Sequence, residues 1–177
     1  GIVAFKGNKE KTSEVIFEGL KLLEYRGYDS CGIGVIDNNE IKTFKWKGRV
    51  RNTEKRFIES KIKSPIAIGH TRWATHGEPN DVNSHPITSY NNKFAIVHNG
   101  IIENYRELKK ILLEKGYEFY TETDTEVLIN FIELCVSNAK NIDKGLSYAL
   151  SKLEGAFGIV LIQSSNTDIM YAARKGS

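Results

Sequence analysis

The stretch Pro65-Ile66-Ala67-Ile68-Gly69-His70-Thr71-Arg72-Trp73-Ala74-Thr75-His76-Gly77 joins an apolar run directly to a long polar segment. The apolar half, residues 65–70, predicts a buried strand. The polar half continues to Asn92 with little periodicity and contains two of the three prolines. A loop of that length inside a compact domain is typically functional or disordered. The stretch therefore predicts a strand that leads into a candidate functional loop.

Apolar periodicity on both sides of this stretch predicts a mixed α and β domain. We expect strands over residues 1–5, 31–37, 41–47, 65–70, 94–98, 156–163 and 168–173. We expect helices over residues 13–25, 57–62, 104–115, 125–138 and 143–153. Asn38-Asn39 predicts a hairpin turn, and Thr123 with Glu126 predicts a capping box. Because strands and helices do not alternate as βαβ units, the order favours an α+β layered domain.

Composition indicates one globular domain and excludes some classes of function. The chain has 177 residues, of which 40% are hydrophobic and 27% charged, with a net charge of +3. That charge is too small to argue for nucleic-acid binding, and no apolar stretch is long enough to span a bilayer. The two cysteines, Cys31 and Cys135, do not suggest a disulfide framework, so we expect a cytoplasmic protein.

Arg72 and Asp124 are candidate ligand-binding residues of opposite charge. A guanidinium is a planar fork that binds a carboxylate through two hydrogen bonds, and an aspartate can bind an ammonium group. Together they would match the two charges of an α-amino acid. Each also has an ordinary structural interpretation: Arg72 as a surface residue beside Trp73, and Asp124 as an acid favoured by the dipole of a helix N-terminus.

Asn99-Gly100 admits two interpretations as well. An Asn-Gly pair after a strand is typical of a type I′ hairpin turn. In the functional interpretation, the asparagine amide and the glycine N–H both point at an oxyanion that develops during a reaction. The first interpretation is favoured unless a nucleophile lies nearby. Cys31 lies inside the chain and is expected to be a small buried residue.

The four histidines do not predict a metal site. They lack the i, i+4 helical spacing of a zinc site, and no cysteine pair accompanies them. We therefore expect no metal. The residues concerned are His70, His76, His85 and His98.

Several strings of this chain are highly specific, and together they span nearly its whole length. They are Gly1-Ile2-Val3, Glu24-Tyr25-Arg26-Gly27-Tyr28-Asp29-Ser30, His70 to Pro79, Asn83-Ser84-His85-Pro86, Val97-His98-Asn99-Gly100-Ile101-Ile102-Glu103-Asn104 and Thr121-Glu122-Thr123-Asp124-Thr125-Glu126-Val127. They resemble the glutaminase domains of the glucosamine-6-phosphate synthase family, which are class II, N-terminal-nucleophile amidotransferases. Relatives that make phosphoribosylamine or asparagine share the scheme but depart from these strings.

The resemblance implies a four-layer αββα sandwich, the N-terminal nucleophile hydrolase fold. It implies that residues 1–177 are one glutaminase domain, which we expect to be cut short at its C-terminal end. In the family a cysteine stands directly before the Gly-Ile-Val segment and attacks the side-chain amide of glutamine. Its own α-amine, which ordinarily titrates near ~8, acts as the base. A glutamyl thioester and ammonia result, water then releases glutamate, and no cofactor is needed.

The resemblance also assigns roles to residues of this chain. Asn99 and Gly100 would form the oxyanion hole, and Arg26 would support the nucleophile. Arg72 would bind the carboxylate of L-glutamine and Asp124 its ammonium group. The remaining substrate-binding positions would be Trp73, Thr75, His76 and His85.

The expected partner is a sugar isomerase domain of the same full-length chain, which is absent here. That domain would use the ammonia to make glucosamine-6-phosphate from fructose-6-phosphate, and a homodimer would form through it. Two alternatives stay open: another class II amidotransferase, and a non-catalytic glutamine-binding module that has lost its thiol.

Overall fold

The computed structural model describes residues 1–60, 62–73, 78 and 80–176. Eight strands in these residues form two antiparallel four-stranded sheets. The first sheet has the order β1-β4-β2-β3, with β1 (Ile2–Lys6), β2 (Ser30–Asp37), β3 (Glu40–Lys47) and β4 (Ile66–Arg72). The second has the order β5-β6-β7-β8, with β5 (Ile87–Thr88), β6 (Phe94–Gly100), β7 (Phe157–Gln163) and β8 (Asn166–Lys175).

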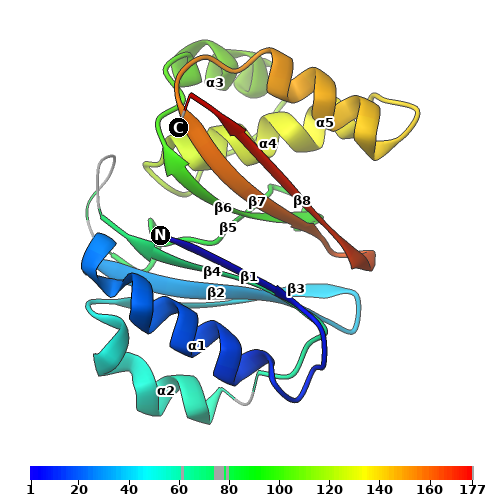
Figure 1. Ribbon diagram of the computed structural model, residues 1–177. Coiled ribbons are helices and arrows are strands. Elements are labelled where there is room, and N and C mark those ends of the chain that lie inside the picture. The colour runs from blue at the N-terminus through cyan, green and yellow to red at the C-terminus, as the bar shows by residue number, and fades with distance from the viewer. Residues whose placement is uncertain (61, 74–77, 79, 177) are drawn as a thin grey trace.

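Helices cover the outer face of each sheet, as Figure 1 shows. The first sheet is covered by α1 (Thr12–Leu23) and α2 (Glu54–Glu59), with short 3-10 turns η1 (Glu24–Arg26) and η2 (Val50–Thr53) beside them. The second sheet is covered by α3 (Tyr105–Glu114), α4 (Asp124–Ser137) and α5 (Ile142–Ser151). The result is a four-layer αββα sandwich, which confirms the predicted α+β class. No helix in the described residues is long and apolar enough to cross a membrane.

The alternation of side chains along β4 determines what lies between the two sheets. Successive residues of a strand point to opposite faces. Ala67 belongs to the core beneath α1, whereas Ile66 and Ile68 belong to an apolar cluster shared with the second sheet. Continuing that alternation places His70 and Arg72 on the face toward the second sheet.

The same alternation operates in β6 of the second sheet. Ala95 and Val97 join the apolar cluster between the sheets, whereas Phe94 and Ile96 pack toward the helices. Asn99 therefore points toward the first sheet and His98 toward α4. At this end of the sandwich the layer between the sheets changes from apolar to polar.

Most predicted elements form close to their expected boundaries, and the hairpin at Asn38-Asn39 is confirmed by left-handed φ angles of 51° and 62°. The hairpin-turn interpretation of Asn99-Gly100 is wrong, because both residues lie within β6 and pair with Gly158 and Phe157 of β7. A hairpin would require β6 to turn directly into a neighbouring strand of the sheet. The chain beyond Gly100 leads into α3 instead.

Three further details differ from the expectations. β4 extends two residues beyond its predicted end, to Arg72, and β5 forms inside the predicted loop. The capping box at the start of α4 is half formed: Thr123 Oγ1 accepts from the Glu126 N–H at 3.2 Å. The Glu126 carboxylate instead accepts from the N–H groups of Tyr120 and Thr121, at 2.8 and 2.7 Å.

Gly32 in β2 lets a distant segment lie directly against the first sheet. A Cβ atom at Gly32 would lie 2.3 Å from the His85 carbonyl oxygen and 2.8 Å from the Phe44 carbonyl oxygen. Backbone atoms cannot move aside as easily as a flexible side chain, so even one methyl group does not fit here.

We expect Gly32→Ala to lower the free energy of unfolding by about 1–3 kcal/mol, the usual cost of overpacking. Gly158→Ala in β7 is the matched control, because a Cβ atom there meets nothing within 4 Å. Urea unfolding of both variants measures the difference. Equal stability of the two would mean that the segment at His85 is not held against β2.

Candidate functional site

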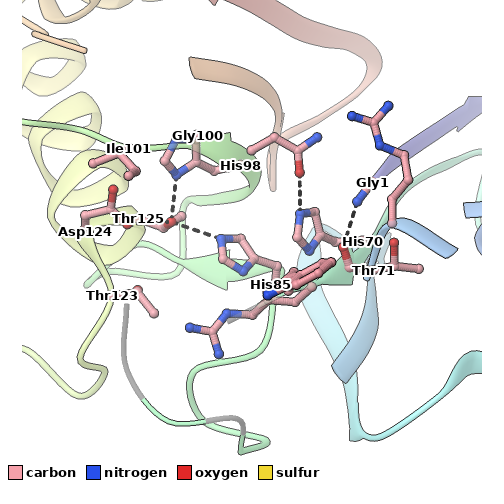
Figure 2. A pocket seen from close by; sticks show the side chains of 14 residues that line it. Gly1, His70, Thr71, His85, His98, Gly100, Ile101, Thr123, Asp124 and Thr125 are labelled. Atoms are coloured by element: carbon pink, nitrogen blue, oxygen red, sulfur yellow. Dashed lines mark hydrogen bonds between the residues drawn. The ribbon is translucent and has the colours of Figure 1, made fainter. Parts of the chain in front are cut away.

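A cavity of about 260 Å³ opens at the polar end of the sandwich, between the two sheets and the start of α4 (Figure 2). This volume lies just below the usual ~300–1,000 Å³ of ligand pockets, which suits a ligand the size of one amino acid. Its lining residues are Gly1, Arg26, His70, Thr71, Arg72, Trp73, His85, His98, Asn99, Gly100, Ile101, Thr123, Asp124 and Thr125.

The first residue of the chain lies at this cavity. The Gly1 nitrogen donates to the Thr71 carbonyl oxygen at 2.7 Å, and the Thr71 N–H donates to the Gly1 carbonyl oxygen at 2.9 Å. These two hydrogen bonds extend the ladder between β1 and β4. Burial, together with the nearby Arg26 guanidinium, lowers the pKa of the Gly1 amine to about 5. Burial and the Arg26 guanidinium thus disfavour a positive charge at this place.

Asn99 and Gly100 reach the cavity from the end of β6. The Asn99 side-chain oxygen lies 2.9 Å from His70 Nε2, so it is engaged by the opposite sheet. Gly100 has a φ of 110°, and a Cβ atom there would lie 2.1 Å from the Ala156 carbonyl oxygen. Only glycine fits such a position, because it combines left-handed backbone with a close approach.

Arg72 and Asp124 line the same cavity with opposite charges. Arg72 is buried at the end of β4, where desolvation lowers its pKa while the carboxylates of Asp29 and Asp124 raise it. Its Nη1 donates to the Glu78 carbonyl oxygen at 3.4 Å. Arg72 is thus not the surface residue of the ordinary interpretation.

Asp124 is the first residue of α4, and its carboxylate is buried. Its Oδ2 accepts from the Ile102 N–H at 2.8 Å, so the carboxylate also fixes the chain just beyond β6. Its Oδ1 lies 3.5 Å from the Thr125 hydroxyl, which donates to it. Thr123 precedes the helix as its N-cap, and its side chain accepts from the Glu126 N–H.

Two buried histidines share one hydroxyl group behind the cavity. His85 Nε2 and His98 Nδ1 each lie 2.9 Å from Thr125 Oγ1, as the dashed lines of Figure 2 show. Because the Thr125 hydroxyl donates its single proton to Asp124 Oδ1, both imidazoles must donate to its oxygen. Burial, followed by the neighbouring His70, holds the pKa of His85 well below its ordinary value. His85 is therefore neutral at physiological pH.

The polar segment that follows Trp73 is tied to the second sheet and its helices. Asn83 is buried and exchanges hydrogen bonds with Glu122: its Nδ2 donates to Oε2 at 3.0 Å, and its Oδ1 accepts from the Glu122 N–H at 3.0 Å. Further along, Ser89 Oγ donates to Glu133 Oε1 of α4 at 2.9 Å. These contacts hold this part of the segment against Glu122 and α4.

The cavity brings together most of the residues that sequence analysis selected. Arg26 and Trp73 lie at its rim, and Trp73 is 60% exposed with its ring centroid 5.6 Å from that of Tyr28. His85 lies deeper and is buried. Thr75 and His76 lie outside the described residues, so their predicted roles stay predictions.

Sequence analysis missed His70, His98 and Thr125 as site residues. The signal for His70 was present, because a polar residue that follows Ile66 and Ile68 in alternation must face the second sheet. Thr125 offered no such signal, since the partners of its hydroxyl come from distant segments.

Neither cysteine of the chain can serve this cavity. Both are buried and do not line it, and burial raises the pKa of each thiol to about 11. Cys31 is the small buried residue that was predicted. Among the described residues, no group of three or more His, Cys, Asp or Glu side chains is arranged to hold a metal ion.

Comparison with known proteins gives consistent matches. The family described as "Glutamine amidotransferase domain" matches residues 70–176. Two similar proteins are the glutamine–fructose-6-phosphate aminotransferases [isomerizing] of Clostridium perfringens, 48% identical, and of Clostridium acetobutylicum, 46% identical, each over 177 residues. All of this chain is covered in both, but it spans only 28% and 29% of their lengths.

Solved structures share the fold. The glutamine phosphoribosylpyrophosphate amidotransferase from B. subtilis, complexed with ADP and GMP, matches with a TM-score of 0.81 and 28% identity, over 98% of this chain and 36% of that chain. A structure described as the allosteric regulatory enzyme of purine biosynthesis matches with a TM-score of 0.80 and 30% identity, over 92% of this chain and 35% of that one.

The buried neutral histidines make stability depend on pH. Burial lowers the pKa of His70 from 6.5 to about 3 in the folded state. Between these values the unfolded chain binds a proton that the folded chain does not, so acid favours unfolding. We expect the free energy of unfolding to fall as pH drops from about 6.5 toward about 3, by up to about 1.4 kcal/mol per pH unit for this histidine.

Urea unfolding at several pH values between 7 and 4 measures the slope, and His70→Gln, which cannot titrate, is the comparison. The variant should show a shallower decline than the unmodified protein. Parallel declines in the two proteins would contradict the assignment of a neutral, buried His70.

Proposed function

The chain belongs to the glutamine amidotransferase domain family, and from this premise we propose that it hydrolyses the side-chain amide of L-glutamine to glutamate and ammonia. The observation that supports this most strongly is the common cavity of Arg72, Asp124, Asn99 and Gly100. It combines groups for the two charges of an α-amino acid with groups for an oxyanion.

Arg72 and Asp124 would bind the backbone end of glutamine. The guanidinium would pair with the α-carboxylate in a bidentate contact, and the Asp124 carboxylate would accept from the α-ammonium group. Burial strengthens both contacts, because charges interact more strongly where water is excluded. The side-chain amide of the ligand would then extend toward the end of β6.

Asn99 and Gly100 would stabilise the transition state there. When a nucleophile adds to the amide carbonyl, negative charge develops on its oxygen. The Asn99 side-chain NH₂ group and the Gly100 backbone N–H are the donors that we assign to this oxygen. Donors of this kind speed the chemical step because they are already oriented when the charge appears.

The nucleophile that we propose is a cysteine immediately before Gly1. The β1–β4 ladder would place that residue opposite Arg72, at the cavity. The thiol sulfur would attack the amide carbon, the free α-amine would take the thiol proton and pass it to the leaving nitrogen, and ammonia would depart. Water would then cleave the glutamyl thioester. The burial and the Arg26 charge that lower the pKa of the Gly1 amine would also favour an unprotonated amine one residue earlier.

The ammonia would serve a second domain of the full-length protein. The related aminotransferases are named for fructose-6-phosphate, and this chain spans less than a third of their lengths. We propose that a sugar isomerase domain of the same chain uses the ammonia to form glucosamine-6-phosphate, and that a homodimer forms through it.

Two free, buried cysteines are consistent with a cytoplasmic protein.

Two alternatives lead to different results. Another class II amidotransferase would hydrolyse glutamine but deliver ammonia to a different acceptor; the 48% identity with the fructose-6-phosphate enzyme, against 28% with the phosphoribosylpyrophosphate enzyme, favours the first assignment. A non-catalytic module would bind glutamine without turning it over.

We expect the protein with a free cysteine before Gly1 to release ammonia from glutamine. A thiol-alkylating reagent should abolish this activity, and Cys31→Ala should retain it because the Cys31 thiol is buried away from the cavity. Glutamate and ammonia release measure the reaction. Activity that survives alkylation, or that is lost with Cys31, would refute the mechanism, and binding without turnover would indicate the non-catalytic module.

We expect Arg72→Ala and Asp124→Asn to weaken glutamine binding through different ends of the ligand. In a closed pocket, each substitution should cost roughly 3–5 kcal/mol of binding free energy, because a buried charge is left without its partner. Asp124→Asn should weaken glutamine binding more than binding of an analogue that lacks the α-amine. Arg72→Ala should weaken binding of every analogue that keeps the carboxylate.

Calorimetric titration of each variant with glutamine and the des-amino analogue measures these effects, and melting temperatures give the control. An equal loss for both ligands in Asp124→Asn, accompanied by a fall in melting temperature, would mean that Asp124 only stabilises the start of α4. Such a role contributes under about 1 kcal/mol at an exposed helix terminus.

A further inference from the structure

We propose that His70 is a positioning residue that holds the Asn99 side chain with its NH₂ group toward the cavity. This inference rests on the proposed glutamine hydrolysis, in which that NH₂ group is an oxyanion donor. His70 would not touch the reacting atoms. It would act through Asn99, by determining which end of the amide faces the substrate.

The contact between the two side chains joins the two sheets. His70 is in β4 of the first sheet and Asn99 is in β6 of the second, and His70 Nε2 lies 2.9 Å from Asn99 Oδ1. Figure 2 shows His70 between Gly1 and the end of β6, with the dashed line marking this contact. The imidazole is buried, so water cannot easily replace it as a partner.

The protonation of His70 decides the orientation of the amide. An asparagine oxygen only accepts hydrogen bonds, so the contact requires a proton on Nε2. A neutral imidazole carries one proton, and Nδ1 is then a bare acceptor. Among the described residues Nδ1 has no hydrogen-bond partner, and a buried N–H left unpaired there would be more costly than an unpaired lone pair. The surroundings thus favour the Nε2–H tautomer.

The opposite tautomer of His70 would reverse the orientation of the Asn99 amide. With its proton on Nδ1, the imidazole would accept from the Asn99 NH₂ group through Nε2. The amide would turn over and direct its oxygen at the cavity, where negative charge develops during the reaction. An acceptor in that position repels an oxyanion instead of stabilising it. His70 therefore selects between a productive and an unproductive rotamer of Asn99.

His70→Leu in the full natural protein tests the inference. It removes the donor and leaves the Asn99 amide free to turn over. We expect kcat for glutamine hydrolysis to fall by about tenfold to a thousandfold, the upper end matching complete loss of one oxyanion donor. KM should change little, because the donor acts on charge that exists only in the transition state. His70→Gln, whose side-chain NH₂ can donate from near the Nε2 position, should recover most of the lost kcat.

A double variant separates positioning from a general structural role. If His70 acts through Asn99, adding His70→Leu to Asn99→Ala should cause no further loss of kcat, because the group it orients is already gone. Ser64→Ala is the stability control: it removes buried hydrogen bonds to Ile36 and Ile66 at the far end of β4 and should leave kcat unchanged.

The outcomes distinguish this inference from the proposed function. Unmodified protein that does not hydrolyse glutamine would refute the function itself. Active protein in which His70→Leu keeps its kcat, or in which the losses of the double variant add, would refute only the positioning role. Failure of the glutamine-like donor to recover kcat, with the variant folded by its melting temperature, would count against it as well.

Discussion

The hydrogen bond between His70 and Asn99 lies where the layer between the two sheets changes from apolar to polar. Much of the site depends on this change from apolar to polar side chains. Up to Ile68 and Val97 the two sheets meet through aliphatic side chains, which exclude water and fix the sheets against each other. One step further in each strand, the alternation presents a polar side chain to the same space. This polar pair is tolerated there because the His70 imidazole and the Asn99 amide oxygen satisfy each other's hydrogen-bonding requirement.

Behind this pair, the polar groups of the site are linked by hydrogen bonds from several segments. Thr125 serves both His85 and His98, and Asp124 holds the backbone at Ile102. A network of this kind is rigid when its members are satisfied and costly when one is removed. The hydrogen bonds at Thr125 and Asp124 therefore hold the adjoining segments in place before any ligand arrives, which favours stabilisation of a transition state.

Apolar periodicity predicted most of the strands and helices and an α+β layered domain, whereas the αββα arrangement was implied by the resemblance of specific strings to a known family. They could not tell that Asn99-Gly100 continues a strand, since the pairing with β7 comes from residues about sixty positions away. They also missed β5, a two-residue strand held by β6. The Glu126 carboxylate does not complete the predicted capping box, because it accepts hydrogen bonds from the N–H groups of Tyr120 and Thr121. Each miss reflects a long-range or competing partner that local patterns do not contain.

The hydrogen bond from the Ile102 N–H to Asp124 would determine how long the ligand's side chain must be. It fixes the carboxylate assigned to the α-ammonium group only two residues beyond Gly100, one of the groups assigned to the oxyanion. The distance between the groups proposed to bind the two ends of the ligand is thereby fixed by the chain from Gly100 to Ile102 and by one hydrogen bond. In the proposed binding mode, an amino acid one methylene shorter would hold its side-chain carbonyl farther from the oxyanion donors. Since a misplacement of about 1 Å can cost a hundredfold in rate, the site would measure side-chain length without any group dedicated to that purpose.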